Sequence, residues 1–443
     1  MPKIEFFGVS ARDSDNIAVN PSRLVNLYRE PIAGIGGATL KSVLATVDFA
    51  PMDIAFGQAV KSVIGRMYAI ADGSAYSVGD DGSVFRLGDL GGNNATISGN
   101  NGNVTFVCGG VYGVWDGISF TRPSSGAFSV FGGHDYIGNY TVLTEANGAR
   151  FQWSNLADAK TLNGLNFSTA DGRDDRCIRP IALNGALYIF KQTSFEVWYL
   201  TGGAGAEAFE RQSGGVVDVG LRAHDLICKI PQGAFFVGSD GRASILSGQV
   251  KPVSIPAVET SIRDEGPLSC FTYEDEGHTF CGISFQDRPS WIYDVSTGEW
   301  HERASGIGNG PWPTIDSTKH NGAWYVMQNA KGIFKLTTAN SDSDSPLVRE
   351  ATSMTLYQDG QRFVVSLLEL FPRQGFSENG LELLISRDGG ITWGEPKPLA
   401  IGPIGKYGQT VRKRALGQFR QITAKVRFSE NAPFSMMAEG RIE

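Results

Sequence analysis

The feature that most constrains how this chain can fold is a series of short strands separated by tight turns. Residues 183–202 (LNGALYIFKQTSFEVWYLTG) show the pattern most clearly. Asn184 and Gly185 tolerate positive φ and can open a turn. An apolar strand rich in aromatic and branched side chains follows at 186–190, and a second, alternating strand at 195–200. Because a single two-stranded ribbon cannot bury its apolar face, this hairpin requires neighbours of the same kind.

Comparable strand–turn–strand units recur roughly every 35 to 50 residues. The units include residues 66–87, 104–117, 136–153, 234–246, 279–300 and 323–336. Asp-Gly pairs, which are strong hairpin signals, provide several of the turns: Asp72 with Gly73, Asp81 with Gly82, Asp116 with Gly117, and Asp240 with Gly241. The period is that of a propeller blade, and radial stacking of blades leaves only short strand edges exposed. We therefore predict an all-β fold with a β-propeller of about six or seven blades; two consecutive β-sandwiches are the alternative.

The repeat pattern divides the chain into three parts. Residues 1–50 lack the hairpin repeat, and we expect them to form an extended N-terminal arm that packs on its own domain or on a neighbour. Residues 51–345 form the predicted propeller, and a polar run at 337–344 (TTANSDSD) follows its last clear hairpin. Residues 346–443 contain strands with a different spacing, which we interpret as a C-terminal β-sandwich-like domain.

Composition supports a globular protein with a sizeable core. The chain has 443 residues, of which 41% are hydrophobic and 19% charged, so it can bury a sizeable core. The N-terminal residues lack the apolar core of a signal peptide, and no apolar stretch is long enough to span a bilayer. The five cysteines show no CxxC spacing, and we expect free thiols rather than disulfides or a zinc site. We expect synthesis in a cytoplasm, no metal, no cofactor and no membrane insertion.

The sharpest local motif is an Asp-box, S-x-D-x-G-x-T-W, at residues 386–393. Asp388 can accept backbone hydrogen bonds across a turn, Gly390 can adopt an unusual φ, and Trp393 can pack beneath the loop, while Ser386 begins the motif. Such boxes stabilise hairpins away from the active site in sialidase-like propellers. We interpret this one as structural, because a carboxylate that holds a hairpin has no free valence for catalysis.

The sequence does not assemble a catalytic set. A sialidase would need an arginine triad, a tyrosine nucleophile and a paired acid. Arg173, Arg176 and Arg179 are available, but nothing orders them around a tyrosine and a glutamate. The charged run 171–176 lacks the order of a calcium loop, so we expect a solvated loop there. We predict that the protein is not an enzyme. The alternative is a β-propeller that is carbohydrate-active, like a sialidase, or that binds glycans.

The C-terminal part is locally basic although the chain has a net charge of −7. The candidate residues are Lys406, Arg412, Lys413, Arg414 and Arg420. Three interpretations remain open: a solvated strand face, a docking surface for an acidic protein partner, and a DNA-facing patch. The acidic balance argues against a protein that grips nucleic acid with its whole surface.

Three regions of the chain resemble the packaged-DNA stabilisation proteins of short-tailed bacteriophages, also called tail hub or nozzle proteins. The first is the arm segment 23–28 (RLVNLY), and the second is the hairpin at 194–202 with its continuation to Gly220 and the segment 254–262. The third lies between Ser386 and Gly417: residues 386–390, 405–407, 412–414 and 416–417. The likeness is thus spread over most of the chain.

This resemblance implies a virion protein of the phage tail with a β-propeller core. It implies a homohexameric ring that extends the portal–adaptor channel, closes the filled head and stabilises packaged DNA until ejection. The lumen would hold or pass double-stranded DNA, and the outside would dock tail spikes or fibres and a needle or plug protein. The family has no catalytic residues to carry over. The arm and loops look short for the family, which bears on the spike and needle contacts.

Overall fold

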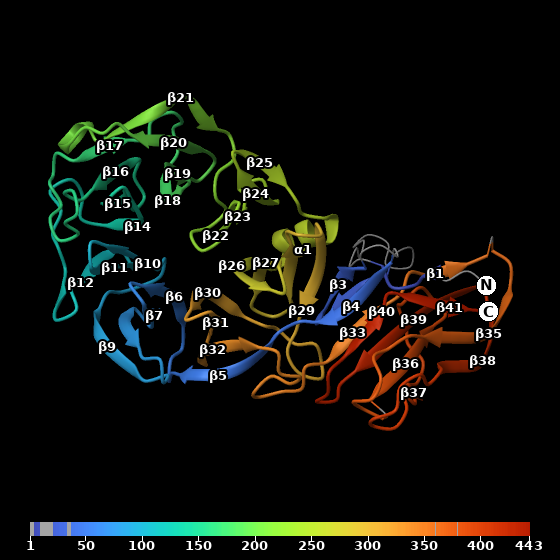
Figure 1. The fold of residues 1–443 in the computed structure, drawn as a ribbon. Helices are drawn as coiled ribbons and strands as arrows, with labels where there is room; N and C mark the ends of the chain where they lie inside the picture. Colours follow the sequence, from blue (N-terminus) through green and yellow to red (C-terminus); the bar gives the residue numbers. More distant parts are fainter. Residues whose placement is uncertain (1–3, 9–20, 33–36, 359, 379) are drawn as a thin grey trace.

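Four-stranded antiparallel sheets succeed one another around a circle in the computed structural model of the chain (Figure 1). The structure describes residues 4–8, 21–32, 37–358, 360–378 and 380–443. Within these residues seven such sheets form the blades of a β-propeller, and the sixth also belongs to a larger sheet. A β-sandwich follows at the C-terminus, so the predicted fold class is confirmed and the alternative of two consecutive sandwiches is wrong.

The first four blades follow the chain in order, each with four strands. Blade 1 contains β6 (Gly57–Val63), β7 (Arg66–Ala71), β8 (Ser74–Val78) and β9 (Val84–Asp89). Blade 2 contains β10 (Thr96–Asn100), β11 (Asn103–Cys108), β12 (Val111–Trp115) and β13 (Phe120–Thr121). Blade 3 contains β14 (Phe131–Ile137), β15 (Tyr140–Glu145), β16 (Arg150–Trp153) and β17 (Phe167–Thr169). Blade 4 contains β18 (Cys177–Leu183), β19 (Ala186–Lys191), β20 (Phe195–Leu200) and β21 (Phe209–Val217), with the 3₁₀ helix η1 (Gly205–Glu207) before its last strand.

Among the last three blades, a helix follows blade 5, and a strand from the N-terminal region completes blade 7. Blade 5 contains β22 (Ile227–Ile230), β23 (Gly233–Val237), β24 (Ala243–Ser247) and β25 (Gln249–Pro252), and α1 (Pro256–Glu265) follows it. Blade 6 contains β26 (Pro267–Asp275), β27 (His278–Phe285), β28 (Ser290–Asp294) and β29 (Glu299–Arg303). Blade 7 contains β30 (Thr314–His320), β31 (Ala323–Gln328), β32 (Gly332–Thr337) and, from the other end of the domain, β5 (Ala45–Pro51). Pairing of β5 with β32 closes the circle with backbone hydrogen bonds.

The predicted turn residues adopt the conformations that tight hairpins need. Asn184 (φ 50°) and Gly185 (φ 82°) connect β18 to β19, and Asp72 (φ 45°) and Gly73 (φ 68°) connect β7 to β8. Two successive residues with positive φ give a turn whose twist matches that of the strands. A further turn of this kind, at Gly138 and Asn139, divides residues 136–143 between the two strands β14 and β15, although the sequence pattern indicates one continuous strand there.

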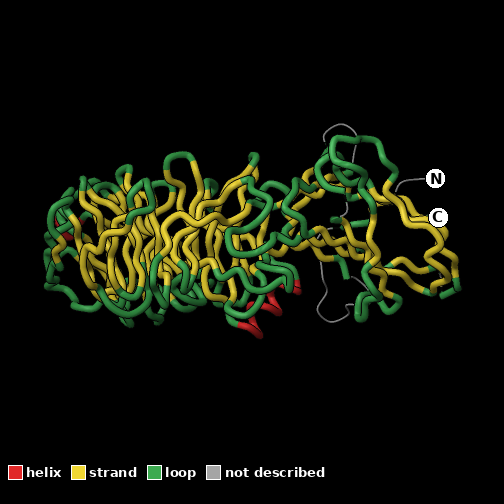
Figure 2. The backbone as a smooth tube through the Cα atoms, turned by 90° about the horizontal axis from the view of Figure 1, so that it is seen from below, coloured by secondary structure: helices red, strands yellow, loops and turns green. Residues whose placement is uncertain are grey.

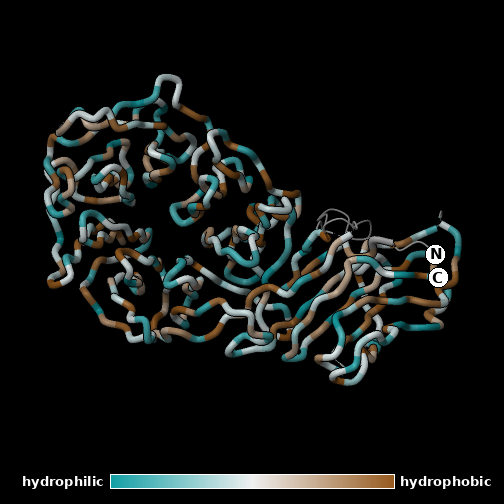
Figure 3. Tube along the Cα trace, in the orientation of Figure 1, coloured by the Kyte–Doolittle hydropathy of each residue, from teal (hydrophilic) through white to brown (hydrophobic). Residues whose placement is uncertain are grey.

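Each pair of neighbouring blades shares a buried apolar cluster. Phe106 lies between blades 1 and 2, Phe151 between blades 3 and 4, and Met327 between blades 7 and 1, all completely buried. Hydrophobic residues recur along the trace of every blade rather than gathering in one part of the propeller (Figure 3). Burial between blades is therefore what holds the ribbons together, as a hairpin with an unburied face requires.

The C-terminal domain packs two main sheets over one apolar core. The first sheet contains β1 (Ile4–Glu5), β41 (Glu439–Ile442), β35 (Phe363–Leu370) and β38 (Val411–Phe419). The second contains β2 (Arg23–Val25), β33 (Arg349–Thr352), β39 (Gln421–Phe428), β36 (Leu381–Ser386), β37 (Lys397–Leu399) and, paired with β39, β34 (Leu356–Tyr357). A small third sheet contains β3 (Leu27–Pro31), β4 (Ala38–Ser42) and β40 (Ser435–Met437). Thr392 and Trp393, at the end of the Asp-box motif, lie in a loop rather than in a strand.

The N-terminal region pairs with strands of its own chain. β1 extends the first sheet of the sandwich, β2 and β3–β4 join the other two sheets, and β5 completes blade 7. The predicted boundary at residues 50 and 51 falls at the end of β5. Of the predicted arm, residues 1–3, 9–20 and 33–36 lie outside the described residues.

The sandwich extends from the rim of the propeller. Seen edge-on, the propeller is a disc and the sandwich continues outward from one side of it (Figure 2). The strand β1 and the C-terminal end of the chain both lie toward the far end of the sandwich (Figure 1). Within the described residues, no helix is both long enough and apolar enough to cross a membrane.

Candidate functional site

The Asp-box closes a loop between β36 and β37. Asp388 accepts hydrogen bonds at Oδ1 from the Ser386 hydroxyl (2.6 Å) and the Thr392 backbone N–H (2.9 Å), and at Oδ2 from the Thr392 hydroxyl (2.5 Å). Ser386 Oγ in turn accepts from the Gly390 N–H at 2.8 Å. These bonds, the Ser386 hydroxyl first, lower the pKa of Asp388 to about 2. The carboxylate is thus engaged within the loop.

Gly390 and Trp393 connect this loop to its surroundings. Gly390 has φ +91°, and a Cβ at this position would lie 3.0 Å from Cβ of Pro21, so a larger residue would be strained there. The ammonium of Lys425 lies 4.3 Å from the centre of the Trp393 ring, a cation–π contact. All four proposed Asp-box residues therefore take part in one loop against the second sheet of the sandwich.

The proposed basic residues lie on and around an edge strand. Arg412, Lys413 and Arg414 lie on β38, which pairs only with β35 among the described strands. Lys406 lies in the preceding loop, and Arg420 in the turn to β39. Four of these residues are exposed and Lys413 is half-buried, and within the described part of the chain none of the five side chains forms an ion pair.

The Asp-box touches the end of this basic strand. Arg387 donates from Nη1 to the Gln418 carbonyl at 2.7 Å, and its guanidinium lies 4.2 Å from the centre of the Phe419 ring. The structure therefore places the two predicted features side by side, with Arg420 next in the chain. Charged residues on an edge strand also keep it from pairing with other chains, which suits the interpretation as a solvated face.

The arginines considered for a sialidase do not converge. Arg173 is exposed and donates from Nε to Asp218 at 2.7 Å, whereas Arg179 lies on β18 and faces the central channel of the propeller. Arg179 is the single arginine among the described residues that line that channel, and Tyr136 lines only the adjoining pocket, which contains no arginine. The channel therefore does not contain the residues that sialidase chemistry needs.

The charged run 171–176 supports a neighbouring hairpin instead of holding an ion. Asp175 accepts at Oδ2 from the backbone N–H groups of Thr193 (2.8 Å) and Ser194 (3.0 Å), which form the turn between β19 and β20. Asp175 also pairs at 2.8 Å with Lys191, a completely buried lysine.

In the described part of the chain, no three His, Cys, Asp or Glu residues are grouped so that they could hold a metal ion. All five cysteines are free thiols, and four of them are buried.

A ten-stranded sheet connects the propeller to the sandwich. It runs from blade 6 (β26 to β29) through β2 into β33, β39, β36 and β37. β2 is parallel to β29 and antiparallel to β33, so a strand from the N-terminal region joins two domains that are consecutive in the chain. The two domains therefore share a continuous network of backbone hydrogen bonds.

Charges of alternating sign cross the same sheet. Arg23 on β2 donates from Nε and Nη2 to both oxygens of Glu302 on β29, at 2.7 and 2.6 Å. On the sandwich side, Glu350 on β33 lies 3.2 Å from Lys425 and 3.2 Å from Arg427, both on β39. Glu302 and Glu350 are each 1% exposed. A buried carboxylate requires such partners, so the charges fix the register of these strands.

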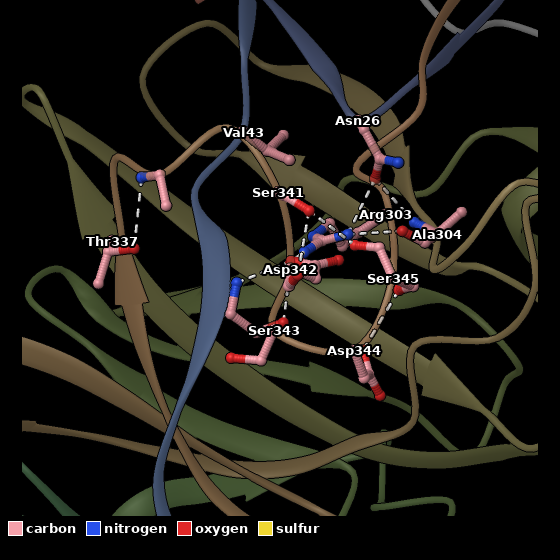
Figure 4. A network of polar contacts seen from close by, with 12 residues as sticks. Asn26, Val43, Arg303, Ala304, Thr337, Ser341, Asp342, Ser343, Asp344 and Ser345 are labelled. Atoms are coloured by element: carbon pink, nitrogen blue, oxygen red, sulfur yellow. Dashed lines mark hydrogen bonds and ion pairs between the residues drawn. The ribbon is translucent and has the colours of Figure 1, made fainter. Parts of the chain in front are cut away.

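A second polar network lies at the junction between the propeller and the sandwich (Figure 4). Arg303 Nη2 donates to Asp342 Oδ1 at 2.7 Å, and Asn26 Oδ1 accepts from Arg303 Nη1 (3.2 Å) and from the Ala304 N–H (2.9 Å). Asn26 also donates to the Val348 carbonyl at 2.7 Å. The network joins blade 6, the N-terminal region and the segment between β32 and β33.

Sequence reasoning missed this junction. Asp342 belongs to the polar run 337–344, which resembles a linker, and its partner Arg303 lies 39 residues away in the chain. Asn26 is 277 residues from Arg303. No local pattern connects residues at such separations. The one local signal in the sequence is Asn26 itself. Asparagine tolerates positive φ better than most residues, and Asn26 has φ 56°.

Together these observations define a closed seven-bladed propeller joined to a β-sandwich through a shared sheet. Comparison with protein families agrees with both parts. The family model described as "Bacteriophage P22 Gp10, beta-propeller" matches residues 47–340, and the model described as "Bacteriophage P22 Gp10, beta-sandwich" matches residues 349–443. The chain belongs to the bacteriophage P22 Gp10 family of phage head–tail stabilisation proteins.

The solved structures similar to this chain share little sequence with it. The computationally designed protein Ika8 is 12% identical, with 66% of this chain and 99% of that chain covered and a TM-score of 0.41. BamB from Moraxella catarrhalis is 13% identical, with 67% and 97% covered and a TM-score of 0.41. PorZ from Porphyromonas gingivalis is 11% identical, with 72% and 44% covered and a TM-score of 0.40. Scores this low support no conclusion about function. No curated protein matches the chain.

Proposed function

We propose that this protein is a structural subunit of a phage tail hub, or nozzle, without enzymatic activity. Copies of the chain form a closed hexameric ring that extends the portal–adaptor channel in the virion. The ring closes the filled head, stabilises the packaged DNA and lets it leave during ejection. A closed ring requires heterologous contacts, in which one surface of each copy meets a different surface of the next.

The observation that supports this role best is the continuous sheet from blade 6 into the sandwich. A subunit that holds pressurised DNA must transmit force between its domains without letting them separate. Here, separation would break backbone hydrogen bonds on both sides of β2 and the ion pairs between Arg23 and Glu302. A simple interdomain linker would instead allow relative motion of the domains.

The basic edge of the sandwich is the proposed docking surface. On β38, Arg412 and Arg414 are exposed, and neither has an ion-pair partner among the described residues. An edge strand can also accept a further strand from a partner. Acidic surfaces of adaptor, spike, fibre, needle or plug proteins fit these cations, and complementary charge would speed their association.

Overall charge is consistent with a lumen that does not hold DNA tightly. The chain has a net charge of −7, and an acidic wall repels phosphate groups. We propose that double-stranded DNA slides along such a wall, while basic groups at the rim contact protein partners. The sequence-independent binding that a basic lumen would cause is thereby avoided.

Reconstitution tests this function. The purified full-length chain is mixed with portal–adaptor complexes from the same phage, and assembly is followed by size-exclusion chromatography and electron microscopy. The proposal expects a stable complex with a ring of this protein on the portal axis. A protein that stays monomeric at high concentration and does not join the portal–adaptor complex would contradict it.

A further inference from the structure

The innermost strands of the seven blades enclose a polar cavity at the centre of the propeller. Its volume is about 210 Å³, and its lining includes residues from β6, β10, β14, β18, β22, β26 and β30. These strands surround the centre of the disc in Figure 1. A water molecule takes up about 30 Å³ in the liquid. The cavity therefore has room for several waters or one small ligand, and it is far too small for a DNA duplex.

Charged side chains from different blades face this cavity. Lys61 comes from β6, Asp135 from β14, Arg179 from β18, Lys229 from β22 and Asp316 from β30. Lys61 is exposed and Arg179 and Lys229 are half-buried, so water in the cavity screens these charges only in part. What the cavity can bind depends on which of these groups already have partners.

The carboxylate of Asp135 is saturated. Its Oδ2 lies 2.5 Å from the Lys229 ammonium and accepts the Ala182 N–H at 2.7 Å, while Oδ1 accepts the Tyr136 N–H at 2.9 Å. Because Lys229 neutralises it, this pair adds no net charge to the cavity.

The other carboxylates of the lining also have donors. Asp316 accepts the Val60 N–H at Oδ2 (3.0 Å) and the Ser317 N–H at Oδ1 (2.8 Å). Asp225 lies 2.5 Å from Nδ1 of His224. The acidic side of the cavity is thus largely satisfied by the protein itself.

Donors, in contrast, are in surplus. Lys61 is exposed, its side chain has no hydrogen bond or ion pair with any described residue, and its ammonium carries three N–H groups. Arg179 donates from Nη1 to the His224 carbonyl at 3.2 Å, but its Nε is buried without a partner. Loss of hydration at the centre of the propeller lowers the pKa of both Lys61 and Arg179, and the nearby carboxylates of Asp135 and Asp316 offset this effect only in part.

We propose that the propeller cavity binds an inorganic oxyanion of the size of phosphate between Lys61 and Arg179. Such an ion supplies the acceptors that the two cations lack, and charge-assisted hydrogen bonds to it are stronger than those to water. A cation would meet carboxylates that are already occupied, and an apolar ligand would leave the buried Nε of Arg179 unsatisfied. Binding would tie the inner strands of blades 1 and 4 together across the channel.

Phosphate titration of the full-length chain tests this site. Phosphate binding is measured by phosphorus NMR line broadening and by calorimetry, at constant ionic strength maintained with chloride. Lys61→Met and Arg179→Met remove one cation each, and Lys251→Met on the exposed outer strand β25 is the control. We expect each cavity variant to weaken phosphate binding about tenfold or more and the control to bind like the wild type.

Crystals soaked in tungstate, a heavier tetrahedral oxyanion, give an independent readout. The proposal expects an anomalous peak between Lys61 and Arg179 that is absent in Lys61→Met. Because the Lys61 side chain has no hydrogen-bond partner among the described residues, this variant should fold even if Arg179→Met does not, and circular dichroism checks both. No phosphate binding by the wild type, or unchanged binding by folded Lys61→Met, would overturn the proposal.

Discussion

Arg303 and Asp342 form an ion pair with 2.7 Å between Nη2 and Oδ1, and each side chain is 1% exposed. Arg303 ends β29 in blade 6, and Asp342 lies in the polar segment between the propeller and the sandwich. Asp342 Oδ1 also accepts the N–H of Thr46, at the start of β5 (2.7 Å). The segment 337–344 is therefore part of the junction, although its composition is that of a linker.

Breaking this pair should destabilise the protein strongly. Arg303→Met leaves the Asp342 carboxylate buried without its cation, and removal of one partner from a buried pair typically costs about 3–5 kcal/mol. We expect a corresponding fall in the free energy of unfolding, measured by urea denaturation. Asp218→Asn, which removes an exposed partner of Arg173, should leave the midpoint nearly unchanged. Equal effects of the two substitutions would contradict this account of the junction.

His278 should make stability depend on pH. Burial lowers the pKa of His278, but hydrogen bonds with Asp294 (2.6 Å) and Glu30 (2.8 Å) outweigh that effect, so its pKa is raised. The stabilisation is therefore complete below the unfolded pKa of about 6.5 and is lost as pH rises through the folded pKa. The loss of stability in His278→Gln should be larger at about pH 5.5 than at about pH 9.

His301 provides a control with the opposite sign. Burial lowers the pKa of His301 to about 3, so the folded protein binds fewer protons there than the unfolded chain between about pH 3 and pH 6.5. Relative to His301→Gln, the wild type should gain stability as pH rises through that range. Denaturation midpoints of the wild type and both variants across the pH series measure how the stability difference changes with pH. The same direction of change for His278→Gln and His301→Gln would contradict the environments described for the two histidines.

Replacement of Asp388 should loosen the Asp-box loop and leave the propeller unchanged. Asp388→Ala removes the acceptor for the Thr392 N–H and hydroxyl and for the Ser386 hydroxyl. We expect faster hydrogen exchange at residues 386–394, measured by mass spectrometry, with the blades unaffected. Asp287→Ala, at an exposed position between β27 and β28, is the control. Unchanged exchange in the loop would mean that the carboxylate does not hold it.

The proposed structural role predicts no glycosidase activity. Purified protein should not hydrolyse sialyl or aryl glycosides above the buffer rate. Activity that disappeared in Asp316→Asn or Asp225→Asn would assign a reaction to the propeller cavity and contradict the structural role. Activity that survived both substitutions would come from elsewhere in the sample.

Charge reversal on the sandwich edge tests the proposed docking surface. Arg412→Glu combined with Arg414→Glu should weaken joining to portal–adaptor complexes about tenfold or more, because like charges would now face the acidic partner. The control Lys251→Glu carries a similar change on the outer strand of blade 5. Unchanged assembly together with altered DNA retention would favour the DNA-facing interpretation, and no effect on either would favour a solvated face.

The repeated hairpins were predictable because each is encoded locally. Asp72, Asn184 and their following glycines specify turns, and alternating apolar residues specify strands between them. The edge strand β38 was not predictable in this way, since its alternation is interrupted at Ala415, which has φ 55°. A bulge of this kind shifts the side-chain pattern and hides the strand.

Features that depend on distant residues could not be read from the sequence. β5 completes blade 7 by pairing with β32, and β2 joins two domains, but neither strand differs locally from other short apolar runs. The central cavity likewise draws side chains from all seven blades, and Lys61 resembles any exposed lysine on a strand. Closure of the circle creates these sites.

Electron microscopy of the purified protein bound to its portal–adaptor complex tests the central claim most directly. The proposed tail hub predicts a closed ring with six-fold symmetry on the portal axis, an open lumen wide enough for duplex DNA, and a sandwich on every subunit. Isolated subunits beside an unoccupied portal–adaptor complex, at concentrations where the ring should form, would contradict it.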